Sequence, residues 1–448
     1  MTMQEHGAGA SGGGCPVHGA VASVRDSLSD PRIQIDPNGF FEKLRNEAPV
    51  YYDEKIAMYL VSRYEDVQTV LRDAATYSLE AGYVQQFAKG FAAEYEQILK
   101  DSGGGYFPDA IMTDPPYHTR IRSLVEHAFT AHRVATLAPR ITDLVERLIN
   151  QVAEKAEGGA VVDVVSEFSV PLTTGIICEQ LGFDELDPRK VQAWSNAVVA
   201  QIGNMQSREQ MLQNARNICE LQNTIIATMR AREVTPREDM ISDLVHATNA
   251  DGGKLTFEEA VSLIRALLIG GNETTAITLT NLFMILATRP DIAQQLQQSA
   301  DDDRLLNRFV EELLRFDPPT RGLMRMTTCE TELGGVHLPK GAHLLVLFSS
   351  ACDDEREFAC PRNFDLNRKN LAKHVAFGGG IHRCIGASLA RMEIKVVSRE
   401  VVRRLEDIRL TVPPDDVRYI PTIISHAIAS LPVTFKRRQV MTSQLEPA

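Results

Sequence analysis

One stretch of ten residues constrains this chain more than any other. Phe377 to Gly386 reads Phe-Gly-Gly-Gly-Ile-His-Arg-Cys-Ile-Gly, so one thiol stands between glycines just before a helical pattern that runs towards Leu405. A cysteine entering a helix N-terminus is favoured as a thiolate by free backbone N–H groups and by the helix dipole. Gly380 and Gly386 let the backbone approach a flat, bulky group, and Phe377 would keep water off the sulfur. These are the requirements of a haem iron held by a thiolate; the alternative is a buried structural cysteine in a glycine turn.

Composition excludes several classes of protein. The 448 residues suffice for one large domain or for two or three ordinary ones. The net charge of -12 argues against nucleic acid as a general partner. The chain has no run of about 18 apolar residues, so no membrane span is predicted, and no signal peptide is visible at its start. The seven cysteines are odd in number and scattered, which favours reduced thiols in a cytosol over a disulfide framework.

The two ends of the chain are expected to lie outside the folded unit. Residues 1–30 are rich in glycine and polar residues and predict a flexible tail. Cys15 and His18 in this tail could be half of a metal site, but no second pair lies nearby. Residues 438–448 are expected to form a C-terminal tail, which leaves 31–437 as one domain.

Helical periodicity covers much of the chain. Long helical patterns fill 139–156, 166–182 and 188–232; the last is rich in Gln and Asn, which suits an adaptable cover, although packing alone would explain it. Strand patterns are short and fall at 50–52, 58–61, 333–336 and 343–348. Residues 76–113 are aromatic-rich without a clear period, so they are expected to be irregular and either functional or disordered.

The longest apolar helical run, Leu255 to Thr288, contains Gly270-Gly271-Asn272-Glu273-Thr274-Thr275 in its middle. Each mid-helix glycine costs about 1 kcal/mol relative to alanine, and threonine hydroxyls compete for backbone carbonyls. We expect the helix to be broken here. A local groove that admits a small ligand would be a reason to tolerate the cost; a plain helix distortion is the alternative.

Two shorter helical segments carry paired side chains. His118 and Arg122 share one face at i, i+4, in a helix whose start is fixed by the prolines at 115 and 116. Two solvated surface cations would be the simpler interpretation. Glu312 and Arg315 at i, i+3 can pair, and as a surface pair they would contribute only a few tenths of a kcal/mol.

Together these motifs resemble those of the cytochrome P-450 family of haem-thiolate monooxygenases. The family signature Phe-x-x-Gly-x-x-x-Cys-x-Gly is matched by Phe377, Gly380, Cys384 and Gly386, and the motifs follow in family order from about residue 38 to about residue 435. The resemblance implies a mainly α fold with a small β region. It would be a single triangular domain, with haem between the long central helix and the helix that follows the cysteine.

The resemblance also implies roles for individual residues. Cys384 would be the axial ligand of a haem b iron, with O2 as co-substrate. Glu273 and Thr274 would relay protons to the distal oxygen, and Glu312 with Arg315 would form a buried pair that locks the segment before the cysteine loop. The other cofactor-binding residues, including the ligands of the haem propionates, would be His118, Arg122, Gly270, Arg325, Phe377, His382 and Gly386.

The substrate pocket is predicted from the same motifs. It would be lined by Ala266, Ile269, Gly270, Thr320, Arg321 and Leu323, together with part of 83–107. Most of these side chains are small and apolar, which suggests a compact hydrophobic molecule such as a terpenoid or a small aromatic. Arg321 would select a carboxylate or another polar end if it points inwards.

One position departs from the family pattern. Residues 354–361 resemble the corresponding segment of bacterial camphor hydroxylases. The family usually has Arg or His just before the Phe-Asp that follows, as the third member of the Glu-Arg network. Here that position is Asn363, with Arg362 beside it. Either Asn363 serves through neutral hydrogen bonds or Arg362 reaches in.

The resemblance implies insertion of one oxygen atom into a C–H or C=C bond by a monomeric, soluble, bacterial-type enzyme of the cytoplasm. No flavin or iron–sulfur motif follows the last strand pattern, so electrons from NAD(P)H are expected through a separate ferredoxin and its reductase. An acidic ferredoxin could dock on a cluster of cations expected on the cysteine side of the haem: Arg120, Arg122, Arg133, Lys373, His374, Arg383 and Arg391.

Three other functions stay open at this point. A peroxide-dependent enzyme of the same fold would normally lack the acid–alcohol pair, which Glu273 and Thr274 supply. A non-catalytic haem sensor or carrier would need neither a proton relay nor an apolar pocket. A cysteine hydrolase using Cys384 and His382 would bind no haem.

Overall fold

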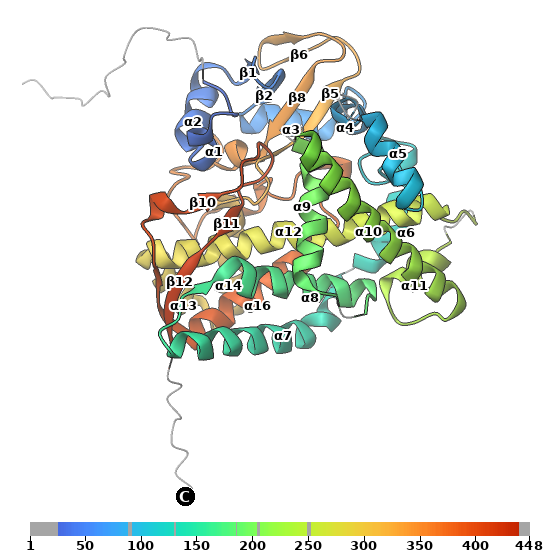
Figure 1. Cartoon of the computed structure of the whole chain (residues 1–448). Helices are drawn as coiled ribbons and strands as arrows, with labels where there is room; N and C mark the ends of the chain where they lie inside the picture. Colours follow the sequence, from blue (N-terminus) through green and yellow to red (C-terminus); the bar gives the residue numbers. More distant parts are fainter. Residues whose placement is uncertain are drawn as a thin grey trace, which may run out of the picture.

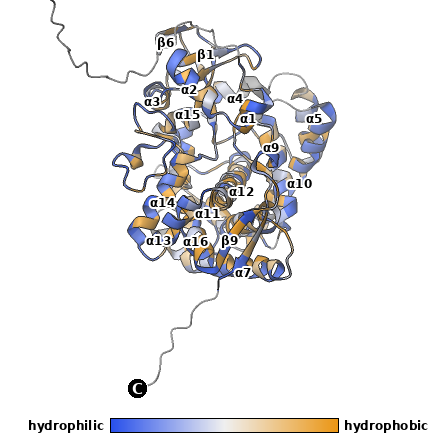
Figure 2. Cartoon of the chain, turned by 90° about the vertical axis from the view of Figure 1, so that its left-hand side faces the viewer, coloured by the Kyte–Doolittle hydropathy of each residue, from blue (hydrophilic) through white to orange (hydrophobic). Residues whose placement is uncertain are grey.

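The computed structural model describes residues 26–87, 92–129, 131–184, 186–203, 207–248 and 252–438. Helices dominate, and the longest of them, α12 (Phe257–Thr288), crosses the middle of the molecule (Figure 1). Its start is fixed by a capping box in which Thr256 and Glu259 each accept a hydrogen bond from the other's backbone N–H. Most of its side chains are buried, because other elements surround it on all sides when the molecule is viewed along its axis (Figure 2).

Two groups of helices enclose α12. On one side lie α7 (Ala131–Glu157), α13 (Pro290–Ser299), α14 (Asp303–Phe316) and α16 (Ala387–Arg404). The other group comprises α8 (Val170–Leu181), α9 (Pro188–Gly203), α10 (Arg208–Val234) and α11 (Met240–His246), with α8 preceded by a π-helical turn over Val165–Ser169. Their apolar faces meet in one large core that includes the fully buried Trp194, Phe168 and Phe283.

A five-stranded sheet caps one end of the helical body. Its strand order is β1-β2-β8-β5-β3, antiparallel except for the parallel pair β2–β8. The strands are β1 (Val50–Asp53), β2 (Met58–Val61), β3 (Tyr77–Ser78), β5 (Gly322–Thr327) and β8 (His343–Leu347). Its faces are covered by apolar residues of α2 (Asn38–Glu47), α3 (Tyr64–Arg72) and α15 (Phe348–Cys352).

Smaller elements complete the fold. β6 (Thr331–Leu333) and β7 (Val336–Leu338) form a hairpin whose turn is Gly334-Gly335, both with positive φ. The remaining strand pairings join β4 (Val162–Asp163), β12 (Pro432–Arg437) and β9 (Leu405–Leu410), and also β10 (Arg418–Tyr419) with β11 (Ile428–Ser430). The remaining α-helices are α1 (Pro31–Ile35), α4 (Leu79–Phe87), α5 (Ala92–Ser102) and α6 (Tyr117–Val125).

The structure differs from the sequence-based expectation in several places. The 76–113 region is not irregular, since it contains β3, α4 and α5. The single helical pattern over 188–232 is two helices, α9 and α10. The N-terminal tail was expected to reach residue 30, but folded structure begins earlier: Ser27 Oγ and Leu28 N both donate to Asp53, and Leu28 is fully buried. Cys15, His18 and the residues after 438 lie outside the described part of the chain.

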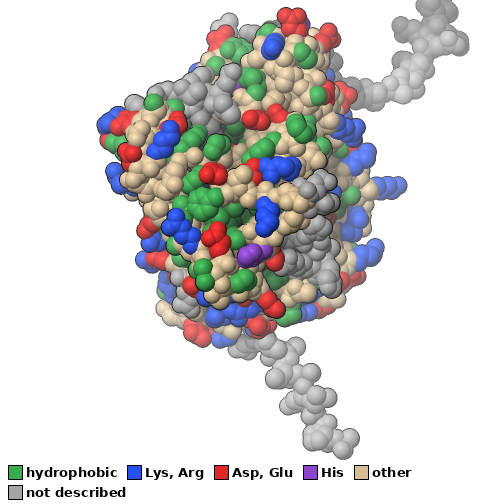
Figure 3. Space-filling model, turned by 90° about the vertical axis from the view of Figure 1, so that its right-hand side faces the viewer, with side chains coloured by type: hydrophobic (Ala, Val, Ile, Leu, Met, Phe, Trp, Pro, Cys, Tyr) green, Lys and Arg blue, Asp and Glu red, His purple; other side chains and the backbone are tan. Residues whose placement is uncertain are grey.

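The described surface mixes charges of both signs. The face on which α5, α6, α10 and α11 lie carries acidic, basic and hydrophobic side chains side by side (Figure 3). Within the described ranges, no helix is both long enough and apolar enough to cross a membrane.

Candidate functional site

The cysteine loop is held by backbone geometry. Gly378 and Gly380 have positive φ, and a Cβ on Gly380 would collide with the carbonyl oxygen of Leu71 in α3. Glycine is therefore required at 380 by the close approach of the loop to α3, a contact that the sequence did not indicate. The Cys384 N–H donates to the Phe377 carbonyl at 3.0 Å, and α16 begins three residues later at Ala387.

The surroundings of Cys384 both oppose and favour its thiolate. Burial raises the pKa of the thiol, whereas the Gly386 N–H and the nearby Arg122 lower it. Cys384 nevertheless retains accessible surface. A thiol that is desolvated by dense surroundings yet accessible faces an internal space, which is where a metal could bind it. A bound metal ion would deprotonate a coordinating thiol outright.

A cluster of imidazole and guanidinium groups lies near the cysteine loop. The rings of His118 and His382 are 4.3 Å apart between centroids. Burial, together with the charge of the nearby Arg325, lowers the pKa of His382 to about 3. Among the described residues, His118 Nδ1 and His382 Nε2 are buried without a hydrogen-bond partner, and the nearest carboxylate oxygen to His382 Nε2, on Asp114, is 4.0 Å away.

These orphaned nitrogens fit an anionic ligand. The Arg325 guanidinium is buried and donates to the Met324 carbonyl at 2.7 Å, and burial lowers its pKa. Arg122 donates to the carbonyl of Arg383, just before Cys384, at 2.9 Å, and thus ties α6 to the cysteine loop. A group with two carboxylates and a metal would satisfy the imidazoles, the guanidiniums and the thiol together, which is what haem offers.

The central helix passes this site without the expected break. α12 is continuous through Gly270–Thr275, and the Thr274 hydroxyl donates to the Gly270 carbonyl at 3.0 Å without interrupting the helix. Gly270 is exposed although it lies mid-helix, and a Cβ there would meet no atom within 4 Å. An exposed residue in the middle of a buried helix faces an internal space, so the groove arises from the missing side chain and not from a kink.

Buried polar bonds fix this part of α12 against its neighbours. A Cβ on Gly271 would lie 2.7 Å from Ile177, so α8 packs directly on the helix backbone. Asn272 is fully buried; its Oδ1 accepts from Thr173 at 2.7 Å and its Nδ2 donates to Ser195 at 3.1 Å. These bonds set the rotation of α12 and thereby aim the residues that follow.

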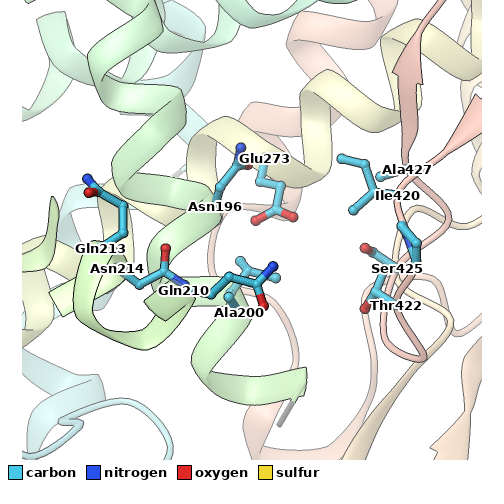
Figure 4. Close-up of a pocket in the computed structure, with 12 residues that line it drawn as sticks. Asn196, Ala200, Gln210, Gln213, Asn214, Glu273, Ile420, Thr422, Ser425 and Ala427 are labelled. Atoms are coloured by element: carbon cyan, nitrogen blue, oxygen red, sulfur yellow. The ribbon is translucent and has the colours of Figure 1, made fainter. Parts of the chain in front are cut away.

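Glu273 points into a cavity of about 390 Å³. Figure 4 shows its carboxylate directed between α9 and α10 on one side and the 420–427 segment on the other. Burial raises the pKa of Glu273 to about 7. The surface of this cavity is mainly apolar, with Val199, Ala200, Ile420, Pro421 and Ala427, but amide and hydroxyl side chains also line it: Asn196, Gln210, Gln213, Asn214, Thr422 and Ser425.

The residues expected to line the substrate pocket fall into two sets. Ala266 and Ile269 flank Gly270 in α12, with Ile269 buried. Thr320 pairs with Ser425 in an isolated β-bridge, and Leu323 packs within the sheet. The Arg321 guanidinium is fully buried, and its Nη1 and Nη2 groups donate to the carbonyls of Thr422 and Gln34, which holds α1 and the 420–427 segment together. Its Nε has no partner among the described residues, so the selection of a carboxylate by Arg321 stays a prediction.

The buried Glu-Arg network has a third member that the sequence analysis missed. Arg315 donates to Glu312 at 2.8 and 2.9 Å, and both side chains are fully buried. The third member is Arg368, whose Nε lies 3.4 Å from Glu312 and which donates to the carbonyls of Ala359 and Asn363. Asn363 contributes only its carbonyl to these bonds, and Arg362 instead stacks on Phe316 and is half exposed.

Comparison with known proteins agrees with this geometry. The family model for Cytochrome P450 matches residues 51–421. Cytochrome P450 107B1 of Saccharopolyspora erythraea is 33% identical over 379 residues, 84% of this chain and 88% of that protein. The 6-deoxyerythronolide B hydroxylase of the same organism is 31% identical over 418 residues, 92% of this chain and 99% of that protein. The solved structure of Cytochrome P450 CYP109Q5 from Chondromyces apiculatus is similar with a TM-score of 0.79 at 31% identity, covering 93% of this chain and 99% of that one.

The match to the family model covers most of the chain, and the structural likeness extends over nearly all of it. The mainly helical, single-domain fold expected from the motifs is confirmed by these structures. Relatives at this level are named hydroxylases and monooxygenases. The chain therefore belongs to the cytochrome P450 family of haem-dependent, oxygen-incorporating oxidoreductases.

Proposed function

We propose that this protein inserts one oxygen atom from O2 into a C–H or C=C bond of a mainly hydrophobic substrate, with haem b held by Cys384. The observation that carries the proposal is the thiol at the start of α16, desolvated yet accessible, beside buried imidazole nitrogens without partners. The test is the spectrum of the reduced, CO-bound protein: a thiolate-ligated haem gives a strongly red-shifted Soret band. A colourless protein would favour the hydrolase alternative.

The chain's own residues would hold the group and exclude water. A haem iron with a thiolate ligand supplies the activation of O2 for C–H oxidation. The Cys384 thiolate would hold its iron, and His118, His382, Arg325 and Arg122 would donate to its carboxylates. Phe377 would cover the sulfur and is itself stacked under Arg391, which Glu311 holds with two hydrogen bonds.

Glu273 and Thr274 would carry protons to the oxygen-binding side. Glu273 faces the solvent-connected cavity, and the neighbouring Thr274 hydroxyl lies on the helix next to Gly270. A carboxyl whose pKa lies near the working pH is suited to take up and release protons. This pair also argues against the peroxide-dependent alternative and against a non-catalytic sensor, neither of which needs proton delivery.

The raised pKa of Glu273 predicts that the amount of product formed per NADH consumed depends on pH. The carboxyl is protonated below about pH 7 and ionised above it. The amount of product formed per NADH should therefore fall as the pH rises through that value, because the ionised carboxylate can no longer donate a proton. Glu273→Gln should be slower and should lose this dependence. Thr274→Ala should release more peroxide at every pH. Product and peroxide yields from about pH 6 to about pH 8.5 check this; an unchanged profile in Glu273→Gln would remove Glu273 from the relay.

The substrate is proposed to be apolar where it reacts. Gly270 provides the open space beside the oxygen-binding position, and Ala266 and Ile269 flank it with small or apolar side chains. Because Arg321 is fully buried and two of its nitrogens donate to backbone carbonyls, no selection for an anionic end is proposed from that residue. A screen of neutral terpenoids and small aromatics by spin-state shift tests this part.

Electrons are proposed to come from NAD(P)H through a separate ferredoxin and its reductase. The cationic cluster expected for docking is largely paired: Arg120 with Glu259, Arg122 with Glu126, Lys373 with Glu357, and both His374 and Arg391 with Glu311. The side chain of Arg133 lies outside the described residues. Arg383 is exposed, adjoins Cys384 and has no ion pair among the described residues, so it is the strongest remaining contact.

Charge reversal at Arg383 should therefore raise the apparent KM for ferredoxin more than charge reversal at Lys373 does. We expect Arg383→Glu to raise the apparent KM for an acidic ferredoxin by about tenfold at low salt, because an opposing charge slows encounter. Salt should shrink the difference, since exposed charges are screened over about 8 Å at physiological ionic strength. Substrate affinity should not change. Equal effects of the two reversals would place the docking face elsewhere.

The cytoplasm and a monomeric state are proposed as well. All six cysteines within the described residues are free thiols, which suits a reducing compartment. Size-exclusion chromatography of the haem-loaded protein checks the monomer.

A further inference from the structure

The cavity into which Glu273 points has a wall that the monooxygenase reaction alone does not explain. Side chains with amide groups line it from α9 and α10, and the 420–427 segment closes the opposite side (Figure 4). Among the described residues that line it there is no lysine or arginine. A free carboxylate or phosphate would have no counter-charge there, and the desolvated Glu273 would repel it. The lining therefore suits a neutral polar group.

The orientation of the Gln210 amide determines whether this side chain can donate a hydrogen bond to a ligand in the cavity or accept one from it. Its Oε1 already accepts from the Ser207 N–H at 2.8 Å, in the capping box that starts α10. The backbone N–H can only donate, so this bond fixes the orientation of the amide and leaves the side-chain NH2 as the free end. Figure 4 shows the Gln210 side chain extending from the α10 side of the cavity to a position below Glu273. The cavity therefore presents an N–H donor, which requires an acceptor on the ligand.

The neighbouring amides of the lining differ in whether they offer a free end. Gln213 lies three residues further along α10, but its Oε1 accepts from Arg216 at 2.7 Å and its Nε2 donates to Asn217 at 3.3 Å, so both ends are used along the helix surface. Asn196 Oδ1 accepts from Gln192 at 2.7 Å, which likewise leaves an NH2 group. The protonated form of Glu273 would be a further donor into the same space.

Gly270 is not among the residues that line this cavity, but it lies close to Glu273 along α12. Glu273 and Gly270 are three residues apart and therefore lie on the same face of the helix. Gly270 is exposed and open beside its Cα. A ligand lying along this face would have its polar end at Gln210 and its apolar part beside Gly270.

We infer that the cavity binds a neutral oxygen acceptor of the substrate, such as an ester or lactone carbonyl, through the side-chain NH2 of Gln210. This rests on the proposed monooxygenase function, which it narrows to substrates with an apolar reacting part and an uncharged carbonyl or ether oxygen. Gln210 is thus a specificity-determining residue. A cationic amine or a free carboxylate at the same place is the competing class.

The test uses three probes of ten carbons each: ethyl octanoate as the neutral ester, decanoate as the anion and heptyltrimethylammonium as a cation that cannot ligate iron. Binding to the haem-loaded protein is measured by calorimetry. We expect the ester to bind most tightly. Gln210→Glu keeps the acceptor for Ser207, because glutamate also completes a capping box, but it replaces the NH2 by a carboxylate oxygen. Gln210→Glu should weaken binding of the ester by about tenfold and strengthen binding of the ammonium probe.

Gln213→Glu is the matched control, since it adds the same charge to the same helix at an amide that does not offer a free donor. It should change ester binding by less than about twofold, the scale of an exposed charge at a distance. Equal effects of the two variants, or a wild-type preference for decanoate or the ammonium probe, would overturn the inference. Failure of the proposed function would be seen separately, as loss of the red-shifted CO spectrum, because calorimetry requires no turnover.

Discussion

Cys384→Ser is expected to fold and to lose monooxygenation by at least two orders of magnitude. Serine is nearly isosteric, and the bonds that hold the loop, from the Cys384 N–H to Phe377 and from Arg122 to Arg383, are made by backbone groups at the loop positions. The hydroxyl cannot replace a soft anionic sulfur that directs electron density towards O–O cleavage. The reduced, CO-bound spectrum should therefore lose its red-shifted Soret band, while circular dichroism stays unchanged.

The activity assay uses a substrate identified by spin-state shift on the wild type. Cys329→Ser serves as the control, because it makes the same chemical change at an exposed free thiol outside this loop. This variant should keep the thiolate spectrum. Product formation by Cys384→Ser at near the wild-type rate would refute the role of Cys384.

Arg368→Met is expected to lower the free energy of unfolding by about 3 kcal/mol, the loss typical of breaking a buried ion pair. The side chain is buried, and its guanidinium bridges Glu312 to the carbonyls of Ala359 and Asn363. Removing it leaves those carbonyls and part of the Glu312 charge without donors in a water-poor interior. Because this network precedes the cysteine loop, haem should also be lost more easily on heating.

Arg362→Met is the matched control, six residues earlier in the same segment. Its side chain is 45% exposed and reaches Asp353 at only 3.4 Å, so its loss should cost no more than about 1 kcal/mol. Thermal unfolding and haem release of both variants, followed by absorbance, give the comparison. If Arg362→Met were the more damaging change, Arg362 and not Arg368 would complete the network.

Local chemistry was readable from the sequence. Cys384 between glycines before a helix and the proline-started helix with His118 could be placed from spacing, because covalent neighbours and helical periodicity fix these arrangements. The same holds for the long apolar segment with Glu273 and Thr274 and for the short strands at 50–53 and 58–61. The order of such motifs indicated the cytochrome P450 family, and the comparison of the chain with known proteins confirms that it belongs to this family.

The tertiary structure decided which polar groups meet across long sequence distances. Arg321, Arg362 and Arg368 are the same residue type, and nothing next to them in the sequence distinguishes their roles. In the structure Arg321 bonds to Gln34, Arg362 lies half exposed, and Arg368 completes the Glu312 network. A guanidinium can bond to any carbonyl or carboxylate within its reach, so its partner depends on packing rather than on its neighbours in the chain. For the same reason the amide-rich pattern of α10 gave no sign that Gln210 extends towards Glu273, whereas Gln213 lines the same cavity with its amide bonded to Arg216 and Asn217. That distinction depends on the rotation of α10 and on how it packs against α12 and the 420–427 segment.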